Sequence, residues 1–134
     1  FEELKRLTLV RSNTQSMYVK KNVGVNVREQ SNGESAFMYF AQKIEENALY
    51  LLDEPENSLS PQKQMELVRF LEDSARFYGC QFIIATHSPF VLSVKNARIY
   101  DFDSYPATVK RWTELENVRV YYNFFKQHRA DFEK

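Results

Sequence analysis

An apolar run that ends in two adjacent carboxylates constrains this chain more than any other stretch of its sequence. The run covers residues 49–52, and Asp53, Glu54 and Pro55 follow it directly. A continuous apolar run of this length is typical of a parallel strand that is buried on both faces of a sheet. Ligands of such sheets collect at the carboxyl ends of the strands. The run therefore predicts an α/β fold with a functional site at Asp53 and Glu54, where one carboxylate can serve a magnesium shell and the other can position a water molecule.

The composition predicts a soluble, globular domain. Of the 134 residues, 43% are hydrophobic and 27% are charged, which suits one domain with a hydrophobic core. Lys plus Arg and Asp plus Glu both number 18, so the net charge of zero gives no global basic field for nucleic acid. A basic cluster near the start (Arg6, Arg11, Lys20 and Lys21) is better explained as a solvated face. The single Cys80 excludes an internal disulfide, and no stretch resembles a signal peptide or a membrane span, which together predict a cytoplasmic protein.

Helix and strand patterns alternate along the chain. Ser31 followed by Glu34 is a capping box, and Ser60 with Pro61 predicts the cap and first turn of a second helix. The order of the elements predicts helices packed on a mostly parallel sheet. The expected elements are a helix after Ser31, a strand at residues 48–52, a helix from Pro61 to about Gly79, a strand at residues 81–85, a short helix from Ser88 to about Val94, a hairpin of residues 97–102 and 108–112, and a last helix from about Leu115 to His128.

Helical spacing also predicts which side chains are buried. The second helix is expected to bury a stripe formed by Met65, Val68, Leu71, Ala75 and Tyr78. The aromatic residues of the last helix are expected to belong to the core and not to a base-stacking platform; they are Tyr121, Tyr122, Phe124 and Phe125.

Three motifs occur in a fixed order along the chain. Gln-Ser-Asn-Gly-Glu-Ser at residues 30–35 opens a helix, Asp53 and Glu54 end a strand, and His87 ends the next strand. In this order and near this spacing they resemble the signature motif, the Walker B strand with its D-loop, and the switch histidine of an ABC-type ATPase, which has a P-loop NTPase fold. The glutamate at position 34 of this motif is similar to that of the SMC-like and RecF-like ATPases. Over about residues 30–132 the chain looks like the predicted soluble AAA/ABC-type ATPases of bacteria. The resemblance implies that residues 1–134 are the C-terminal part of a single ABC-type ATPase domain.

The resemblance also implies a role for each motif residue. Asp53 would bind Mg²⁺ through water, Glu54 would orient or deprotonate the attacking water, and His87 would sense the γ-phosphate of ATP. The signature residues would contact the γ-phosphate bound by a partner protomer, as a helix N-terminus suits an anion; they are Ser31, Asn32, Gly33 and Glu34. The D-loop residues would contact the partner protomer; they are Ser58, Leu59 and Ser60. A transporter D-loop usually carries Asp where Ser60 stands. Each of these residues has an ordinary structural alternative, as a helix cap, a surface ion pair or a hydrogen-bonded loop residue.

No phosphate-binding loop occurs in the sequence. The pattern Gly-x-x-x-x-Gly-Lys-Ser/Thr is absent, and the three glycines stand at positions 24, 33 and 79. The backbone amides of that loop, together with its Lys, hold the phosphates of a bound nucleotide. The upstream Walker A half of the same protein is therefore expected to lie outside this chain, either deleted, disordered or on another segment. This chain alone is expected not to hydrolyse ATP.

The interpretation is ATP binding and hydrolysis by an ABC-type ATPase that sandwiches Mg-ATP head to tail, either as a homodimer or with a second ATPase domain. Two alternatives stay open: the nucleotide-binding subunit of an ABC transporter, and a non-catalytic interaction module on an ABC scaffold. The signature helix and Glu56 disfavour the first alternative. Retention of Asp53, Glu54 and His87 together disfavours the second. The process that hydrolysis would drive stays open, with nucleic acid among the candidate partners.

Overall fold

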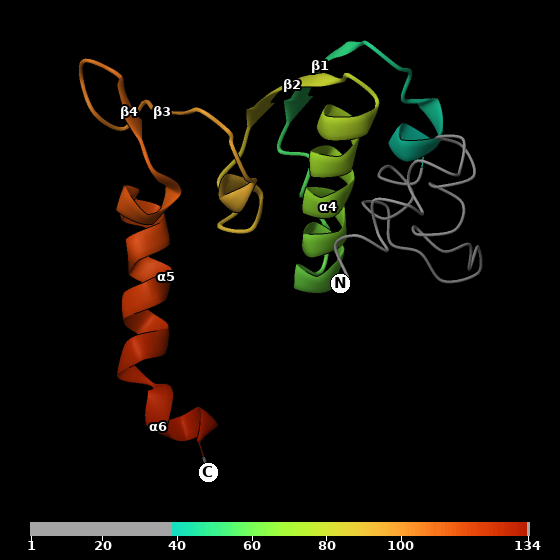
Figure 1. Ribbon diagram of the computed structural model, residues 1–134. Helices are drawn as coiled ribbons and strands as arrows, with labels where there is room; N and C mark the ends of the chain where they lie inside the picture. The colour runs from blue at the N-terminus through green and yellow to red at the C-terminus, as the bar shows by residue number, and fades with distance from the viewer. Residues whose placement is uncertain (1–38, 134) are drawn as a thin grey trace. The chain divides into compact units, whose positions relative to one another are not determined.

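The computed structural model describes residues 39–133, and the chain divides into two compact units, Phe1–Thr86 and His87–Lys134 (Figure 1). The predicted signature residues 31–34 lie outside the described part. The described elements are, in chain order, a helical segment at residues 39–43, β1 (Leu49–Asp53), α4 (Pro61–Phe77), β2 (Gln81–Ala85), the 3-10 helix η1 (Val91–Ser93), β3 (Ile99–Asp101), β4 (Thr108–Lys110), the 3-10 helix η2 (Trp112–Glu114), α5 (Glu116–Gln127) and α6 (Arg129–Phe132).

In the first unit, β1 and β2 form a parallel pair, as the two apolar runs predict. The register is continuous from Leu49 opposite Gln81 to Asp53 opposite Ala85. Two parallel neighbours need a crossover connection, because the chain must return to the starting edge before the second strand begins. Here α4 provides it (Figure 1). The carboxyl ends of both strands therefore meet at one edge, beside the predicted carboxylates.

The prediction that both faces of these strands are buried is wrong for the described structure. Exposed and half-buried residues alternate along each strand. The half-buried face carries Tyr50, which stacks on Phe82 and meets the edge of Phe40 in the helical segment at residues 39–43; Phe40 in turn packs against Phe70 of α4. On the other face, Leu51 is 73% exposed and Ile83 is 58% exposed. Continuous apolar runs of this kind signal strands covered on two sides, and the described helices cover one.

Helix α4 begins and ends where the sequence predicts. The side chain of Ser60 accepts a hydrogen bond from the backbone N–H of Lys63, and Pro61 occupies the first turn. Both features are favoured at a helix start, since the first turn has unpaired N–H groups. After Tyr78, Gly79 has a φ of +66°, and a Cβ there would lie 2.4 Å from Oδ1 of Asn47. The left-handed backbone favours glycine, and a Cβ at this position would also require the Asn47 side chain to move.

The buried stripe of α4 is shifted by about one residue from the predicted one. Leu71 and Tyr78 are buried as expected, but Met65 and Ala75 are exposed. The observed stripe keeps the helical spacing of three and four residues that packing against one neighbour requires. The buried residues are Leu67, Phe70, Leu71, Asp73 and Ser74, with Tyr78 directly after the helix.

The second unit consists of η1, an antiparallel hairpin and the C-terminal helices. Strands β3 and β4 pair with Ile99 opposite Lys110 and Asp101 opposite Thr108, which confirms the predicted hairpin. The loop between them contains a cis peptide bond between Tyr105 and Pro106. Helix α5 follows η2 and confirms the expected last helix, and the short α6 after it was not predicted.

The predicted burial of the C-terminal aromatics is wrong in the described structure. Within α5 the buried residue is Val118, one helical turn after the buried Leu115. The four aromatic side chains are each about half exposed; they are Tyr121, Tyr122, Phe124 and Phe125. Their helical spacing is compatible with a core, but the described elements offer no surface that covers them.

Candidate functional site

The predicted catalytic carboxylates lie at the carboxyl edge of the parallel pair. Asp53 is the last residue of β1 and Glu54 follows it, so both stand where ligands of parallel sheets gather. Both residues are exposed. Within residues 39–133, neither carboxylate takes part in a hydrogen bond or ion pair with another side chain. Their oxygens are therefore open to a ligand or to solvent.

The backbone at Glu54 is held in an unusual conformation. Its φ is +43°, in the left-handed region that residues with a Cβ rarely occupy. Such a conformation costs on the order of 1–3 kcal/mol and persists where the surroundings determine it. The Glu54 N–H donates to the carbonyl of Ala85 at 2.9 Å, and its carbonyl accepts from the N–H of Asn57 at 2.9 Å. The backbone of Glu54 is thus held by the end of β2 and by the turn that follows β1.

The predicted D-loop residues divide into an exposed part and an anchored part. Ser58 is exposed and has a φ of +63°. Leu59 is 7% exposed, and its carbonyl accepts a hydrogen bond from the side-chain amide of Gln64 at 3.0 Å. Ser60 caps α4 through its side chain. Its hydroxyl therefore has a structural use at the position where transporter sequences usually carry Asp.

A side-chain contact between Glu56 and Thr86 was not predicted from the sequence. The Thr86 hydroxyl donates to Oε1 of Glu56 at 2.5 Å, and both residues are half-buried. Glu56 follows β1 and Thr86 follows β2, so the bond joins the two loops at the site edge. The two residues stand 30 positions apart, and no local pattern pairs them. The sequence features that point to this contact are a carboxylate two residues after Glu54 and a hydroxyl directly after the second apolar run, and neither indicates the other as its partner.

His87 is the first residue of the second unit. It is exposed, and its carbonyl accepts a hydrogen bond from the side-chain amide of Asn117 at 3.3 Å. Directly after it, the hydroxyl of Ser88 accepts from the N–H groups of Phe90 at 3.1 Å and Val91 at 3.3 Å. The predicted helix from Ser88 is confirmed only in part. Helix η1 covers Val91–Ser93, its N-cap is Phe90 without a side-chain cap, and the Ser88 hydroxyl closes the turn that precedes it. The assignment of His87 as a γ-phosphate sensor stays a prediction.

Comparison with known protein families gives a match. Residues 13–93 match the model of a family described as "AAA domain, putative AbiEii toxin, Type IV TA system". The chain belongs to this AAA-domain family. A search of curated proteins and a search of solved structures each gave no match. The match identifies an AAA-type, P-loop NTPase-like region with a nucleotide-binding, ATPase-like function, in agreement with the coarser part of the sequence prediction.

The matched region contains all residues of the predicted site. It spans the signature residues, which lie outside the described part, and also Asp53, Glu54, the D-loop and His87. Its small parallel sheet agrees with the predicted α/β class. Across residues 39–133, no helix is both long enough and apolar enough to cross a membrane.

The carboxylates of this AAA domain would hold magnesium only together with water molecules and the phosphates of a nucleotide. Among the described residues, no three or more His, Cys, Asp or Glu side chains come together as a metal cage. Mg²⁺ in nucleotide sites is usually held by one or two carboxylates, several waters and the phosphates. Asp53, exposed and unpaired at the strand end, suits the role of the single protein carboxylate in such a set.

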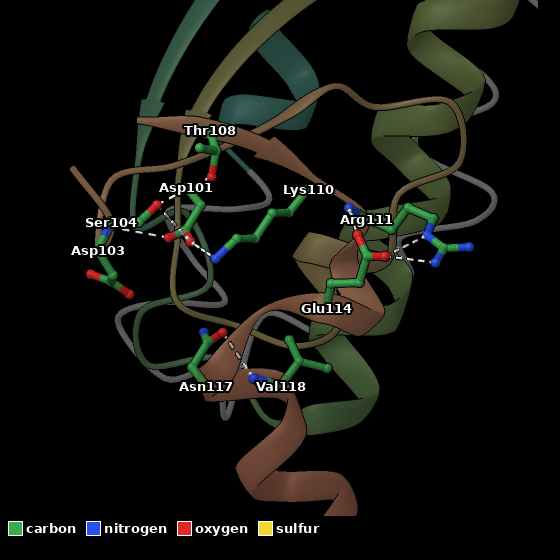
Figure 2. A network of polar contacts seen from close by, with 9 residues as sticks. All are labelled: Asp101, Asp103, Ser104, Thr108, Lys110, Arg111, Glu114, Asn117 and Val118. Carbon is green, nitrogen blue, oxygen red and sulfur yellow. Dashed lines mark hydrogen bonds and ion pairs between the residues drawn. The ribbon is translucent and has the colours of Figure 1, made fainter. Parts of the chain in front are cut away.

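A second polar network lies in the β3–β4 hairpin (Figure 2). The carboxylate of Asp101 accepts hydrogen bonds from the N–H of Asp103 at 3.1 Å, from the Ser104 hydroxyl at 3.4 Å and from the Lys110 ammonium. The bond to Lys110 is the main reason that the pKa of Asp101 is lowered and the pKa of Lys110 is raised. Asp101 is 8% exposed. With three donors already bound, this carboxylate serves the hairpin and is not a ligand site.

Proposed function

We propose that this chain carries the catalytic carboxylates of an ABC-type ATPase that binds ATP with Mg²⁺ and hydrolyses it. The observation that carries the proposal is the state of Asp53 and Glu54. Two adjacent, exposed carboxylates stand at the carboxyl edge of a parallel pair, without side-chain partners among the described residues. The second of them is held in a left-handed backbone conformation, which is a feature of functional sites in proteins.

The two carboxylates would have different roles. Glu54 would accept a hydrogen bond from the attacking water and take its proton, which in phosphoryl transfer is largely a matter of positioning. Asp53 would hold a water of the metal shell. Magnesium, when bound, neutralises charge that develops on the phosphate oxygens. His87 would donate a hydrogen bond to the γ-phosphate and report its loss.

The phosphate-binding part of the site would come from another segment. None of the 134 residues forms the Gly-rich loop with its Lys that gives a P-loop site most of its phosphate contacts. An upstream Walker A half of the same protein would supply it. The complete domain would act in the cytoplasm.

Two complete domains would close head to tail around two ATP molecules. The signature residues, which are Ser31, Asn32, Gly33 and Glu34, would contact the γ-phosphate held by the partner. Ser58 would lie at the dimer contact, because it is the exposed member of its loop, while Leu59 and Ser60 anchor that loop to α4. ATP binding would close the dimer and hydrolysis would open it.

The proposal is tested by Glu54→Gln in the full-length protein. The amide keeps the size and hydrogen bonding of the side chain but cannot take a proton from water. We expect turnover to fall by about 10²-fold or more, with ATP binding retained and a closed dimer accumulating on size-exclusion chromatography. Glu116→Gln, an exposed carboxylate in the first turn of α5, is the matched control. Near-normal hydrolysis by Glu54→Gln would remove Glu54 from the catalytic role.

A further inference from the structure

The hydrogen bond between Glu56 and Thr86 lies at the edge of the parallel pair that carries the candidate site. It begins from a hydroxyl one residue after β2 and ends on a carboxylate three residues after β1. The donor is the Thr86 hydroxyl and the acceptor is Oε1 of Glu56. Both side chains are half-buried, so solvent competes for this bond less than for one on an open surface.

We infer that Glu56 and Thr86 are a positioning pair that fixes the orientation of Glu54. The inference rests on the proposed function, since it concerns the residue that would handle the attacking water. Neither residue is expected to touch the nucleotide. Their effect would pass through the turn that Glu54 opens.

The backbone around Glu54 shows how the effect would pass. The turn of residues 54–57 is closed by the bond from the Asn57 N–H to the Glu54 carbonyl, and Glu56 lies within it. The Glu54 N–H is bound to the carbonyl of Ala85, the residue directly before Thr86. The turn is therefore attached to the end of β2 twice, once through the backbone of Glu54 and once through the side chain of Glu56.

The two hydrogen bonds to the end of β2 help to hold the strained backbone of Glu54. Glu54 follows β1 directly and its N–H is bound to Ala85, and the side-chain bond of Glu56 adds a second attachment to the end of β2 that restricts the turn further. Glu54 has a φ of +43°, which persists only where the surroundings determine it. Loss of the Thr86 hydroxyl would leave the Ala85 carbonyl as the remaining attachment of these two. Glu54 could then relax toward an ordinary conformation and aim its carboxylate away from the water.

An effect of this kind differs from general destabilisation. Misplacement of a catalytic group by about 1 Å can lower a rate by about 10²-fold without a change in binding. A positioning pair should therefore affect kcat and leave KM for ATP and the melting temperature nearly unchanged. A bond that only stabilises the fold should lower the melting temperature, and should lower kcat only as far as the folded fraction falls.

The test compares Thr86→Val with Thr86→Ser in the full-length protein. Valine keeps the shape of threonine without the hydroxyl, and serine keeps the hydroxyl. We expect Thr86→Val to lower kcat by about tenfold to 10²-fold, with KM nearly unchanged, and Thr86→Ser to restore most of the rate. Glu56→Gln, which keeps an acceptor oxygen and the volume, should fall between wild type and Glu56→Ala.

A double-mutant cycle decides whether the two residues act together. Thr86→Val with Glu56→Ala should be no slower than the slower single variant, because either change alone removes the bond. Rate losses that multiply would overturn the inference, as would equal rates for Thr86→Val and Thr86→Ser, or an effect on KM alone. Glu54→Gln is measured beside them. If it keeps its activity, the proposed function fails; if it is inactive while Thr86→Val keeps a normal kcat, only the positioning pair fails.

Discussion

Asp53 ends β1 and Asp101 ends β3, so each unit places a carboxylate at the end of a strand. In both cases the preceding residues are apolar or aromatic. Asp53 is exposed and without a side-chain partner in the described part of the chain, whereas Asp101 is 8% exposed and binds three donors. A similar local pattern has therefore produced an open carboxylate in one unit and a satisfied one in the other.

The strand next to each carboxylate accounts for the difference. In the parallel pair, Asp53 lies opposite Ala85, which has no polar side chain. In the antiparallel hairpin, Asp101 lies opposite Thr108, and Lys110 stands two residues further along on the same face. Side chains of this diagonal arrangement are within reach of each other when one of them is long. A carboxylate at a strand end is thus a candidate ligand site only when its neighbouring strand leaves it unpaired.

The largest expected effect that separates the two carboxylates is on turnover. Asp53→Asn in the full-length protein should lower steady-state ATP hydrolysis by about 10- to 100-fold, as loss of a carboxylate near a metal commonly does. Asp101→Asn should leave hydrolysis within error of wild type. The measurement is a coupled ATPase assay at saturating Mg-ATP. An equal loss of rate in both variants would contradict the assignment of Asp53 to the catalytic site and of Asp101 to the hairpin alone.

A smaller effect, in the opposite order, is expected on stability. Asp101→Asn should lower the melting temperature of the full-length protein, because it removes the charge that binds Lys110 and weakens the acceptor of the hairpin loop. Asp103→Asn is the matched control, since its own side chain is exposed. Differential scanning fluorimetry without nucleotide gives the comparison. A melting temperature that falls equally in the two variants would mean that the network around Asp101 does not stabilise the hairpin.

The smallest effect is a pH dependence confined to the hairpin. The bond from Lys110 is the chief cause of the lowered pKa of Asp101 in the folded protein. A lowered folded pKa means that the stabilisation is fully present above the usual Asp pKa of about 3.9 and is lost as the pH falls through the folded value. Carboxyl ¹³C NMR of the full-length protein should show Asp101 titrating below the ordinary range. A midpoint at or above the ordinary value would contradict the charged pair.

Much of the local structure could be predicted because it depends on near neighbours. The cap at Ser60, the stop at Gly79, the two strands and the hairpin all follow from patterns within a few residues. The family match likewise agrees with the ATPase-like prediction. These features need no knowledge of which segments meet in space.

What could not be predicted depends on long-range placement. The Glu56–Thr86 bond joins residues 30 positions apart, and the pairing of Asp101 with Lys110 depends on the register of the hairpin. Burial of the strands and of the α5 aromatics was predicted from apolarity alone. An apolar side chain indicates that its burial is favourable, but not which element of the fold buries it. The left-handed backbone of Glu54 also has no sequence signal, since Glu is not a residue that favours it.

The buried Cys80 has a chemical consequence for the first unit. Its thiol is 5% exposed and donates to the carbonyl of Glu45 at 3.2 Å, and burial raises its pKa. The thiolate is the nucleophile that reacts with alkylating reagents, so both burial and protonation slow the reaction of the native thiol. It is also the one cysteine in the 134 residues. Its rate of alkylation therefore reports how often the turn between α4 and β2 opens. Cys80 directly precedes β2, the strand that leads to Thr86, so its thiol serves as an internal probe of this part of the first unit.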